Sequence, residues 1–328
     1  MSYTKTTWIN GAVPAINATN LNKIEDGIAD AFQEIIDSKA VTFSEFLASG
    51  TWTKPAAARW VLVDIISGGA GGGGGGRYST ATAARGGRGG AGGGRLQWLF
   101  PAGDLGATVS VVVGAGGDGG LGVAVGASDA QFGAVGQDGG NSSFGDIVVK
   151  GGQYPTGSAF VGKGGGLANA PSNTPGYGIL GPGGQNTDVA GLSAEWGGGN
   201  GDLMYGSLAK GAGSSLFGGS AGGAGGYAVT PLNTLRYGAL GGEPSKYGVG
   251  SGVTSEFAGA NGADGDGITS GRGGGGGGGA SGANGYDGGT GGFPAGGGGG
   301  GGGSNSSLSY RGGNGASGGN GVVRVYAW

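Results

Sequence analysis

The stretch that decides the fold is "RWVLVDIISGGAGGGGGG", residues 59–76. Its first half is a continuous apolar run of the kind that forms a buried β-strand, and its second half has almost no side chains. Similar glycine runs recur at "GRGGGGGGGASG" (271–282) and "FPAGGGGGGGGSNSS" (293–307). The chain therefore either joins its strands by mobile glycine linkers or uses bare backbone as a packing element.

Composition favours ordered backbone. The 328 residues include 96 glycines but only 10 prolines, and the glycines do not follow a sustained Gly-X-Y repeat. Both observations exclude collagen. Charged residues make up only 11%, and aromatic residues are spread through the glycine regions, unlike a disordered chain. Ordering each glycine costs about 0.5–1 kcal/mol more than ordering alanine. Extended, polyproline-II-like strands offset that cost when they hydrogen-bond to several neighbours, and only glycine permits so close an approach. We therefore expect a polyglycine-II-like bundle, with mobile loops as the alternative.

The sequence lacks the residues that several classes of enzyme and cofactor site require. The chain has no Cys and no His, which removes thiol nucleophiles, disulfides, the usual zinc ligands and the commonest general base. "VGKGGG" (161–166) has Gly164 where a phosphate loop needs Ser or Thr, and GxGxxG recurs too often to mark a dinucleotide site. Asp264 and Asp266 have the spacing of a calcium loop, but the Asp-Gly and Asn-Gly pairs around them are typical of turns. We expect no enzymatic activity, no cofactor and no metal.

Charge and hydropathy bear on partners and location. The net charge of −3 is carried by residues 1–50, so the rest of the chain is neutral and offers no basic surface to nucleic acid. No run of 18 apolar residues occurs, and "MSYTKTTW" lacks the features of a signal peptide. We expect a product made in the cytoplasm, without membrane insertion.

Residues 1–40 differ from the rest. A turn-rich lead-in precedes a helix that we expect to be capped by Thr19 or Asn20 and to run to about Lys39. Apolar residues with 3-4 spacing form a narrow seam typical of a coiled coil: Leu21, Ile24, Ile28, Ala31 and Ile35. Parallel helices from several copies are our interpretation. Packing of the helix on its own domain, or on a different protein, remains open.

Residues 41–150 hold the strongest strand signals. Strands are expected at "VTFSEF" (41–46), "TWTKP" (51–55), "WVLVDII" (60–66), "RLQWLF" (95–100), "ATVSVVV" (107–113) and "SSFGDIVVK" (142–150). The last strand, within residues 320–328, is expected to complete the same β-sandwich from the far terminus, with the glycine segments as excursions that leave it and return. Residues 151–319 would be the glycine-rich, polyglycine-type region with exposed loops. The expected fold is thus mainly β, with a short N-terminal helix, a β-sandwich and a glycine bundle.

Specific segments resemble bacteriophage fibre proteins. "WINGAVPAINATNLNKIEDGI" (8–28) closely resembles the N-terminal attachment segment of many phage tail-fibre and baseplate-associated proteins. "SGTWTKPAAARWVLVDIISGGAGGGGGG" (49–76), "ATVSVVVGAGGDGG" (107–120), "SSFGDIVVKGG" (142–152) and "GGNGVVRVYAW" (318–328) resemble the glycine-rich domain of phage tail fibres. The chain is also similar in concept to the distal tail-fibre adhesins of T-even phages, whose polyglycine sandwich carries receptor-binding loops, although it has its own attachment helix.

The resemblance implies a receptor-binding protein of a virion. It would be made in the host cytoplasm, assemble as a homotrimer through the helix, and join other virion proteins through Trp8, Ile9, Asn10, Pro14, Ile16 and Asn20. Its partner would be a host-surface glycan or an outer-membrane protein. A structural head fibre or spacer without its own receptor is the alternative. An ice- or polymer-binding polyglycine protein is a third, disfavoured because the aromatic-studded segments interrupt a flat Ala/Thr face.

Large rings outside the expected strands are the candidate receptor contacts, because a backbone-only bundle has little room for them inside. They are Tyr154, Phe160, Tyr177, Trp196, Tyr205, Tyr227, Tyr237 and Tyr247. For each ring, filling the junction between sandwich and bundle is an equal alternative. Arg77, Arg85, Arg88 and Arg95 lie around the first glycine run and either meet acidic sugars or keep the surface soluble.

Overall fold

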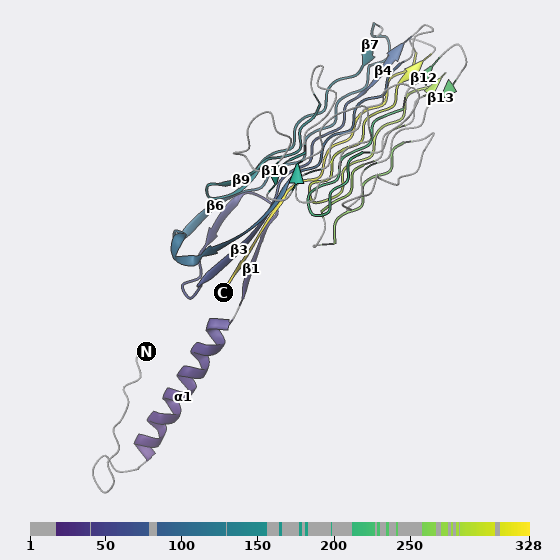
Figure 1. The fold of residues 1–328 in the computed structure, drawn as a ribbon. Coiled ribbons are helices and arrows are strands. Elements are labelled where there is room, and N and C mark those ends of the chain that lie inside the picture. Colours follow the sequence, from purple (N-terminus) through teal and green to yellow (C-terminus); the bar gives the residue numbers. More distant parts are fainter. Residues whose placement is uncertain are drawn as a thin grey trace.

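Among the residues that the structure describes, the fold is mainly β with one α-helix, as the sequence predicts. The structure is a computed structural model. It describes residues 18–39, 41–78, 84–128, 130–155, 212–226, 258–266, 283–305 and 309–328, with shorter stretches at 164–165, 177–178, 181–182, 198, 228–229, 234–235, 241, 270–274, 277 and 280–281. In Figure 1 the helix stands at one end, two sheets follow it, and long parallel traces of glycine-rich chain extend to the opposite end.

Helix α1 spans Ala18–Lys39, which confirms the expected helix and its end. It begins one residue before Thr19, so Thr19 and Asn20 lie in its first turn and not at its cap. Two residues separate α1 from the first strand, and Figure 1 shows the helix projecting away from the sheets.

Two four-stranded antiparallel sheets form the part of the chain next to α1, which we call the two-sheet body. One sheet has the order β1 (Thr42–Phe46), β16 (Val322–Ala327), β3 (Trp60–Ile66) and β5 (Arg95–Pro101). The other has the order β2 (Gly50–Thr53), β6 (Thr108–Val112), β8 (Ser142–Phe144) and β9 (Ile147–Val149). A short 3-10 helix, η1 (Ala102–Asp104), follows β5.

These strands agree closely with the sequence expectation. β16 lies between β1 and β3, so the far terminus does complete the sheet. The stretch 142–150 was expected as one strand but forms β8 and β9. The reason is a tight turn at Gly145, whose φ of 56° suits a residue without a side chain.

One apolar core joins the two sheets. Val61, Val63 and Ile65 alternate with outward-facing residues along β3 and are completely buried. From the other sheet, Trp52 and Phe144 pack against them, with ring centroids 5.6 Å apart. Alternation with period two explains this core, because every second residue of a strand faces the same way.

Glycine-rich segments continue the strands beyond the body. β3 runs into 67–76, β6 into 113–123 and β9 into 150–155, whereas 84–94, 133–141 and 311–321 lead back into β5, β8 and β16. Further extended segments at 212–226, 258–266, 270–274 and 283–305 pack with them. We call these segments together the glycine array. The body and the array therefore interleave along the chain, whereas the strand signals in the sequence predict a single boundary at about residue 150.

Hydrogen bonds in the array repeat every three residues. Along 67–76, successive backbone N–H groups donate in rotation to three segments, for example Gly71 to Gln137, Gly72 to Ala316 and Gly73 to Arg88. The N···O distances along this segment are 2.7–3.0 Å. Its carbonyl groups accept from three other segments, which contain Gly117, Gly152 and Gly298. Segment 67–76 thus has six neighbours, and 295–303 likewise bonds to six.

This packing explains the glycine content. A methyl carbon placed on Gly72 would lie 2.1 Å from the carbonyl oxygen of Gly299, and one on Gly74 would lie 2.0 Å from that of Leu121. Backbone conformation is not the reason, because positive φ occurs among the described residues only at Gly126, Gly145 and Ala295. The array requires glycine for the space that a side chain would fill.

Asn and Asp side chains accept hydrogen bonds from backbone N–H groups at the surface of the array. Outer N–H groups without a backbone acceptor donate instead to a side-chain oxygen of the next segment. Examples are Gly122 to Asn314 at 3.0 Å, Gly151 to Asn141 at 3.0 Å and Phe293 to Asp264 at 2.7 Å. Successive acceptors lie three residues apart, as Asp138 and Asn141 do. Asp264 therefore has a structural role in capping backbone, which neither the calcium nor the turn interpretation anticipated.

Candidate functional site

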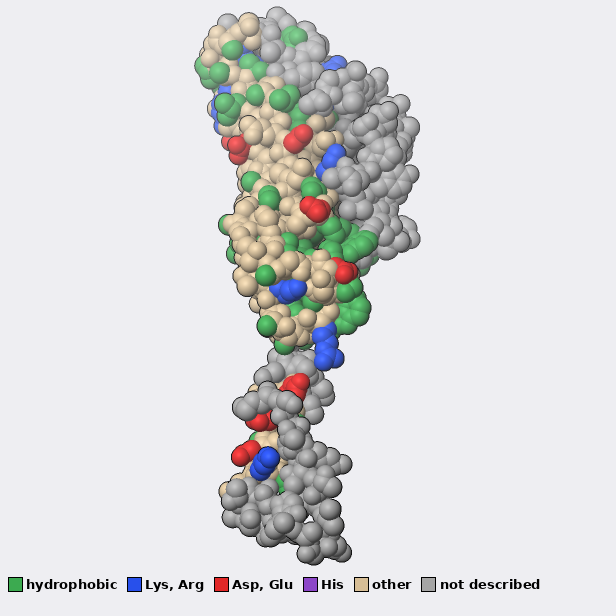
Figure 2. Space-filling model, turned by 90° about the vertical axis from the view of Figure 1, so that its left-hand side faces the viewer, with side chains coloured by type: hydrophobic (Ala, Val, Ile, Leu, Met, Phe, Trp, Pro, Cys, Tyr) green, Lys and Arg blue, Asp and Glu red, His purple; other side chains and the backbone are tan. Residues whose placement is uncertain are grey.

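The end of the array farthest from α1 is where the chain reverses and side chains return. We call it the distal end and define it as the described residues of 75–85, 123–133, 226–235, 280–287 and 302–313. In Figure 1 it carries β4 and β7 with β12 and β13. Figure 2 shows the flank of the array mostly in tan, the colour of backbone and of side chains that are neither hydrophobic nor charged, with scattered hydrophobic side chains along it and at this end.

Short strands organise the distal end. A four-stranded sheet has the order β14 (Ala280–Ser281), β15 (Ser304–Asn305), β4 (Gly75–Tyr78) and β7 (Ala130–Phe132). β12 (Ala228–Val229) and β13 (Thr234–Leu235) form a hairpin beside it. Elsewhere, β10 (Tyr177–Gly178) pairs with β11 (Gly181–Pro182).

Arg77 is the anchor of this end. Its side chain is completely buried, and its guanidinium donates a hydrogen bond to the carbonyl oxygen of Ala127. Arg77 pairs with Ser304 in the sheet, and the Ser304 hydroxyl donates to the carbonyl of Ala283 at 2.6 Å. These contacts join four of the segments that make up the distal end, so the end has a fixed frame.

Around that frame lie aromatic and cationic side chains. Tyr78, Tyr286 and Tyr310 are half-buried, and Arg85 is exposed. Tyr78 pairs with Asn305, and the carbonyl of Arg85 accepts from Gly76, so both residues belong to the last turn of the array. Tyrosine rings stack on sugar or apolar groups and offer a hydroxyl, while guanidinium groups bind carboxylates and phosphates. The arrangement suits recognition of a surface and contains no catalytic pairing among these residues.

An apolar patch flanks the distal end. Leu121, Val125 and Val135 are 69%, 57% and 62% exposed. Their segments are neighbours, because the N–H of Ala134 donates to the carbonyl of Leu121 at 2.7 Å. These three residues are not among the contacts predicted from the sequence. The signal for Leu121 and Val135 is an apolar side chain three residues from a polar one, since Asp118 lies three residues before Leu121 and Asp138 lies three residues after Val135.

Asp287 and Arg311 form an ion pair beside Tyr286. Their N···O distance is 2.9 Å, and the N–H of Asn314 also donates to Asp287 at 2.6 Å. Partial burial by itself raises the pKa of Asp287, but the bonds from Arg311 and Asn314 outweigh it and leave the pKa below its ordinary value. The same pair raises the pKa of Arg311.

Stability is expected to fall in acid partly because of Asp287. A carboxyl whose folded pKa is lowered stabilises the fold above its unfolded pKa of about 4, and the contribution disappears as pH drops towards the folded pKa. The pair is half-exposed, so the effect is about 1 kcal/mol or less. Thermal unfolding from pH 6 to pH 2 should show a smaller decrease in Tm for Asp287→Asn than for the native chain. Parallel curves for the two proteins would contradict this role.

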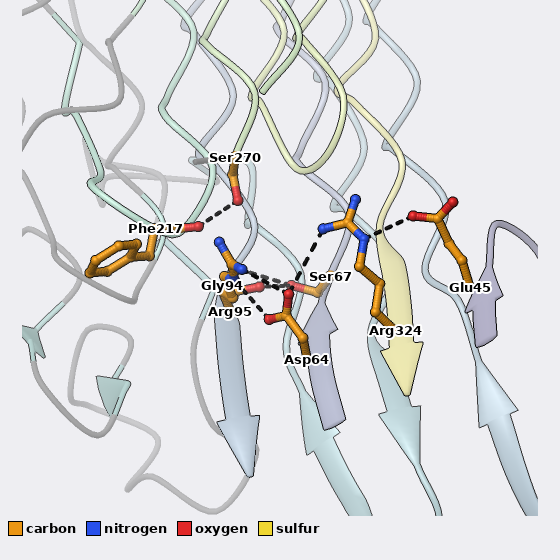
Figure 3. A network of polar contacts seen from close by, with 8 residues as sticks. All are labelled: Glu45, Asp64, Ser67, Gly94, Arg95, Phe217, Ser270 and Arg324. Carbon is orange, nitrogen blue, oxygen red and sulfur yellow. Dashed lines mark hydrogen bonds and ion pairs between the residues drawn. The ribbon is translucent and has the colours of Figure 1, made fainter. Parts of the chain in front are cut away.

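The junction between body and array contains a buried charge network (Figure 3). Arg95 donates two hydrogen bonds to Asp64, each 2.7 Å long, and both side chains are about 5% exposed or less. Arg324 lies 3.8 Å from Asp64 and 2.8 Å from Glu45. Nearby, the Ser67 hydroxyl accepts the N–H of Gly94 at 2.9 Å. The network fixes the direction in which β3 and β5 leave the body.

The four arginines of the first glycine run do not form one cluster. Arg77 and Arg85 are at the distal end and Arg95 is at the junction, while Arg88 lies between them on the returning segment. Arg88 donates to the carbonyl of Pro155 at 3.2 Å, and burial lowers its pKa. Only Arg85 among them is exposed enough to meet a ligand.

Tyr154 is the one expected receptor contact whose side chain is described. It is 8% exposed, and its hydroxyl covers Gly73, where an added methyl carbon would lie 2.1 Å from it. Burial raises the pKa of its phenol, although the nearby Arg88 acts in the opposite direction. Such a position favours the alternative that this ring fills space against the array.

The other expected contacts lie outside the residues whose side chains are described: Phe160, Tyr177, Trp196, Tyr205, Tyr227, Tyr237 and Tyr247. The same holds for the expected attachment residues Trp8, Ile9, Asn10, Pro14, Ile16 and Asn20. Of the seam, Leu21, Ile28 and Ala31 are exposed and Ile24 is half-buried, while the Ile35 side chain is not described. Phe32, which the seam did not include, is 66% exposed.

Within the described residues, no cluster of three or more possible metal ligands occurs, and no helix has both the length and the apolar character to cross a membrane.

No protein-family model matches the chain, and no curated protein matches it. A function for this chain therefore depends on its own geometry and on the resemblance of the segments quoted above.

Proposed function

We propose that the chain is a bacteriophage virion fibre, an adhesin without enzymatic activity that joins the particle through its N-terminal segment and binds the host surface through its distal end. The partner would be a surface glycan or an outer-membrane protein. Support comes from the resemblance of residues 8–28 to phage attachment segments and from the separation of α1 and the distal end to opposite ends of the molecule (Figure 1).

The finer description of the fold belongs to this proposal. We take the two-sheet body as a β-sandwich and the glycine array as a bundle of polyglycine-II-type strands. What supports the second assignment is the three-residue repeat of its hydrogen bonds and the six neighbours of segments 67–76 and 295–303. Close backbone contacts at Gly72 and Gly74 fit the same interpretation.

The observation that carries the functional proposal is the distribution of large side chains. The interior of the array is mostly backbone, and elsewhere in the described array tyrosine and arginine occur singly, as Tyr154, Arg88 and Arg272 do. At the distal end several such residues occur together: Tyr78, Arg85, Tyr286 and Tyr310. A bundle held by backbone hydrogen bonds acts as a stiff spacer. Its turns are free to differ in sequence, which suits a surface that must fit a receptor.

Self-association through α1 is part of the same proposal. A helix of 22 residues is marginal alone in water, and apolar residues along α1 are exposed. Parallel helices from three copies would bury the seam of Leu21, Ile24, Ile28, Ala31 and Ile35. A homotrimer would present three distal ends together and so raise avidity.

Binding to cells tests the proposal. Fluorescently labelled full-length chain is added to a broad panel of bacterial strains, and bound protein is measured by flow cytometry. On strains that bind it, the triple variant Tyr78→Ala, Arg85→Ala, Tyr310→Ala should bind at least about tenfold more weakly, since tyrosine and arginine dominate hot spots.

The matched control changes exposed residues on the flank of the array, Asp118→Ala and Gln137→Ala, and should bind as the native chain does. Equal loss in both variants would count against a distal site. Absence of binding across the panel would favour the spacer function, in which the chain carries no receptor contact of its own.

A further inference from the structure

The outer face of the sheet β1-β16-β3-β5 is divided into a covered half and an open half. Next to the array, Ile66 and Val322 point outward from the body and are fully buried, because Phe293 and Ala295 pack on them. Asp64 and Arg95 are buried on the same face. This half of the sheet therefore has apolar or paired residues on both sides, as a sheet covered on both faces requires.

The half next to α1 has the same apolar character without a cover among the described residues. A row of side chains crosses all four strands: Phe43 pairs with Tyr326, Tyr326 with Leu62, and Leu62 with Leu99. Phe43 and Leu99 are 55% and 49% exposed, and the rings of Phe43 and Tyr326 lie 5.0 Å apart. Trp60, in the next row towards α1, is 43% exposed. Figure 2 shows hydrophobic side chains gathered on one flank of the body at this level.

A charged row separates the two halves and carries no net charge. Glu45, Arg324 and Asp64 lie side by side across β1, β16 and β3, and Arg95 of β5 reaches Asp64 from the neighbouring row. The successive N···O distances are 2.8, 3.8 and 2.7 Å. Because each charge already has a partner, this row can border a dry interface without leaving an unpaired ion. It also gives identical copies no reason to repel each other here.

Along the sequence, exposed apolar residues continue from α1 into β1, the first strand of the open face. α1 ends at Lys39 and β1 begins at Thr42, and Val41 between them is 59% exposed. Exposed apolar side chains thus run from Leu21 and Ile28 through Val41 to Phe43. Parallel association of the helices would place the open faces of the copies at the same height and within reach of one another.

We propose that a second copy of this chain covers the open face, so that the copies touch through their sheets as well as through α1. This inference rests on the self-association proposed for α1 and adds a second contact to it. In a ring of three copies, the β1 side of one face meets the β5 side of the next, because rotational closure pairs unlike edges.

Cross-linking tests the contact directly, since the chain has no cysteine of its own. In Phe43→Cys/Leu99→Cys, a bismaleimide with an ~8 Å spacer should give covalent dimers and trimers of the full-length protein. Within one chain the two cysteines stand three strand spacings apart, about 14 Å, so this reagent cannot join them. Val112→Cys, on the outward side of the opposite sheet and 43% exposed, should remain uncross-linked.

Sedimentation equilibrium supplies the second measurement. Leu99→Asp should weaken association at least about tenfold, because it places an unpaired charge in the contact, whereas Val112→Asp should leave it unchanged. A native trimer without Phe43–Leu99 cross-links, and with equal association for both Asp variants, would overturn this inference and leave the helix seam intact. A monomeric native chain would overturn the sheet contact and the trimer together, while cell binding would still decide the adhesin proposal.

Discussion

Gly72→Ala is expected to destabilise the fold so strongly that most of the protein no longer folds. The added methyl carbon would lie 2.1 Å from the carbonyl oxygen of Gly299 and 2.4 Å from its carbon, and both are backbone atoms. Neither segment has room to move, because Gly72 donates to Ala316 and accepts from Gly120. We expect a loss above about 4 kcal/mol, which is comparable with the whole stability of many domains. Soluble yield and thermal unfolding followed by circular dichroism would show it.

Gly103→Ala is the matched control. Gly103 lies in η1, and a methyl carbon there would meet nothing within 4 Å. Its replacement should change stability by less than about 1 kcal/mol, because only the entropy of the unfolded chain is affected. Similar Tm values for the two variants would mean that the array tolerates side chains and is not closely packed.

Asp64→Ala is expected to destabilise the protein by about 3–5 kcal/mol, the cost of leaving a buried charge without its partner. Arg95 would then lie buried near a second cation, Arg324, with no carboxylate between them. Guanidinium chloride unfolding, followed by tryptophan fluorescence, measures the change through the shift in midpoint.

Two comparisons separate burial from charge. Glu45→Gln removes the more exposed carboxylate of the same network and should cost about 1 kcal/mol or less. The double variant Asp64→Leu/Arg95→Met replaces the buried pair by apolar groups and should recover much of the loss. Equal midpoints for Asp64→Ala and Glu45→Gln would show that the Asp64–Arg95 pair is not buried as described.

The strands of the body were predictable because their pattern is local. Alternation along "ATVSVVV" identifies Val109 and Val111 as inward residues, and both are buried. The turn at Gly145 was missed, since glycine is so common in this chain that one more carries little information. The extent of the array was also missed, because whether a glycine run leaves the body or joins it depends on neighbours far away in sequence.

The candidate site was less accessible to sequence reasoning. Aromatic residues were selected for lying between strands, yet Tyr154 is held inside by contact with Gly73, a partner 81 positions earlier in the chain. Tyr78, Tyr286 and Tyr310 gather at one end only because distant reversals of the chain meet there. The pairing of Asp64 with Arg95 depends on register between β3 and β5, which spacing alone does not give.

Every third N–H group of a segment donates to the same neighbouring segment. This repeat limits how such a chain can change length during evolution. An insertion of three residues at the same level of every segment would lengthen the rod by about 9 Å and restore every contact. An insertion of one residue would turn all later residues by about 120°, moving a side chain such as that of Asp118 into a space that holds only backbone. The turns beyond the last bonded glycine obey no such rule. Shaft length in a lineage of such proteins would therefore change in steps, while the turns diversify residue by residue.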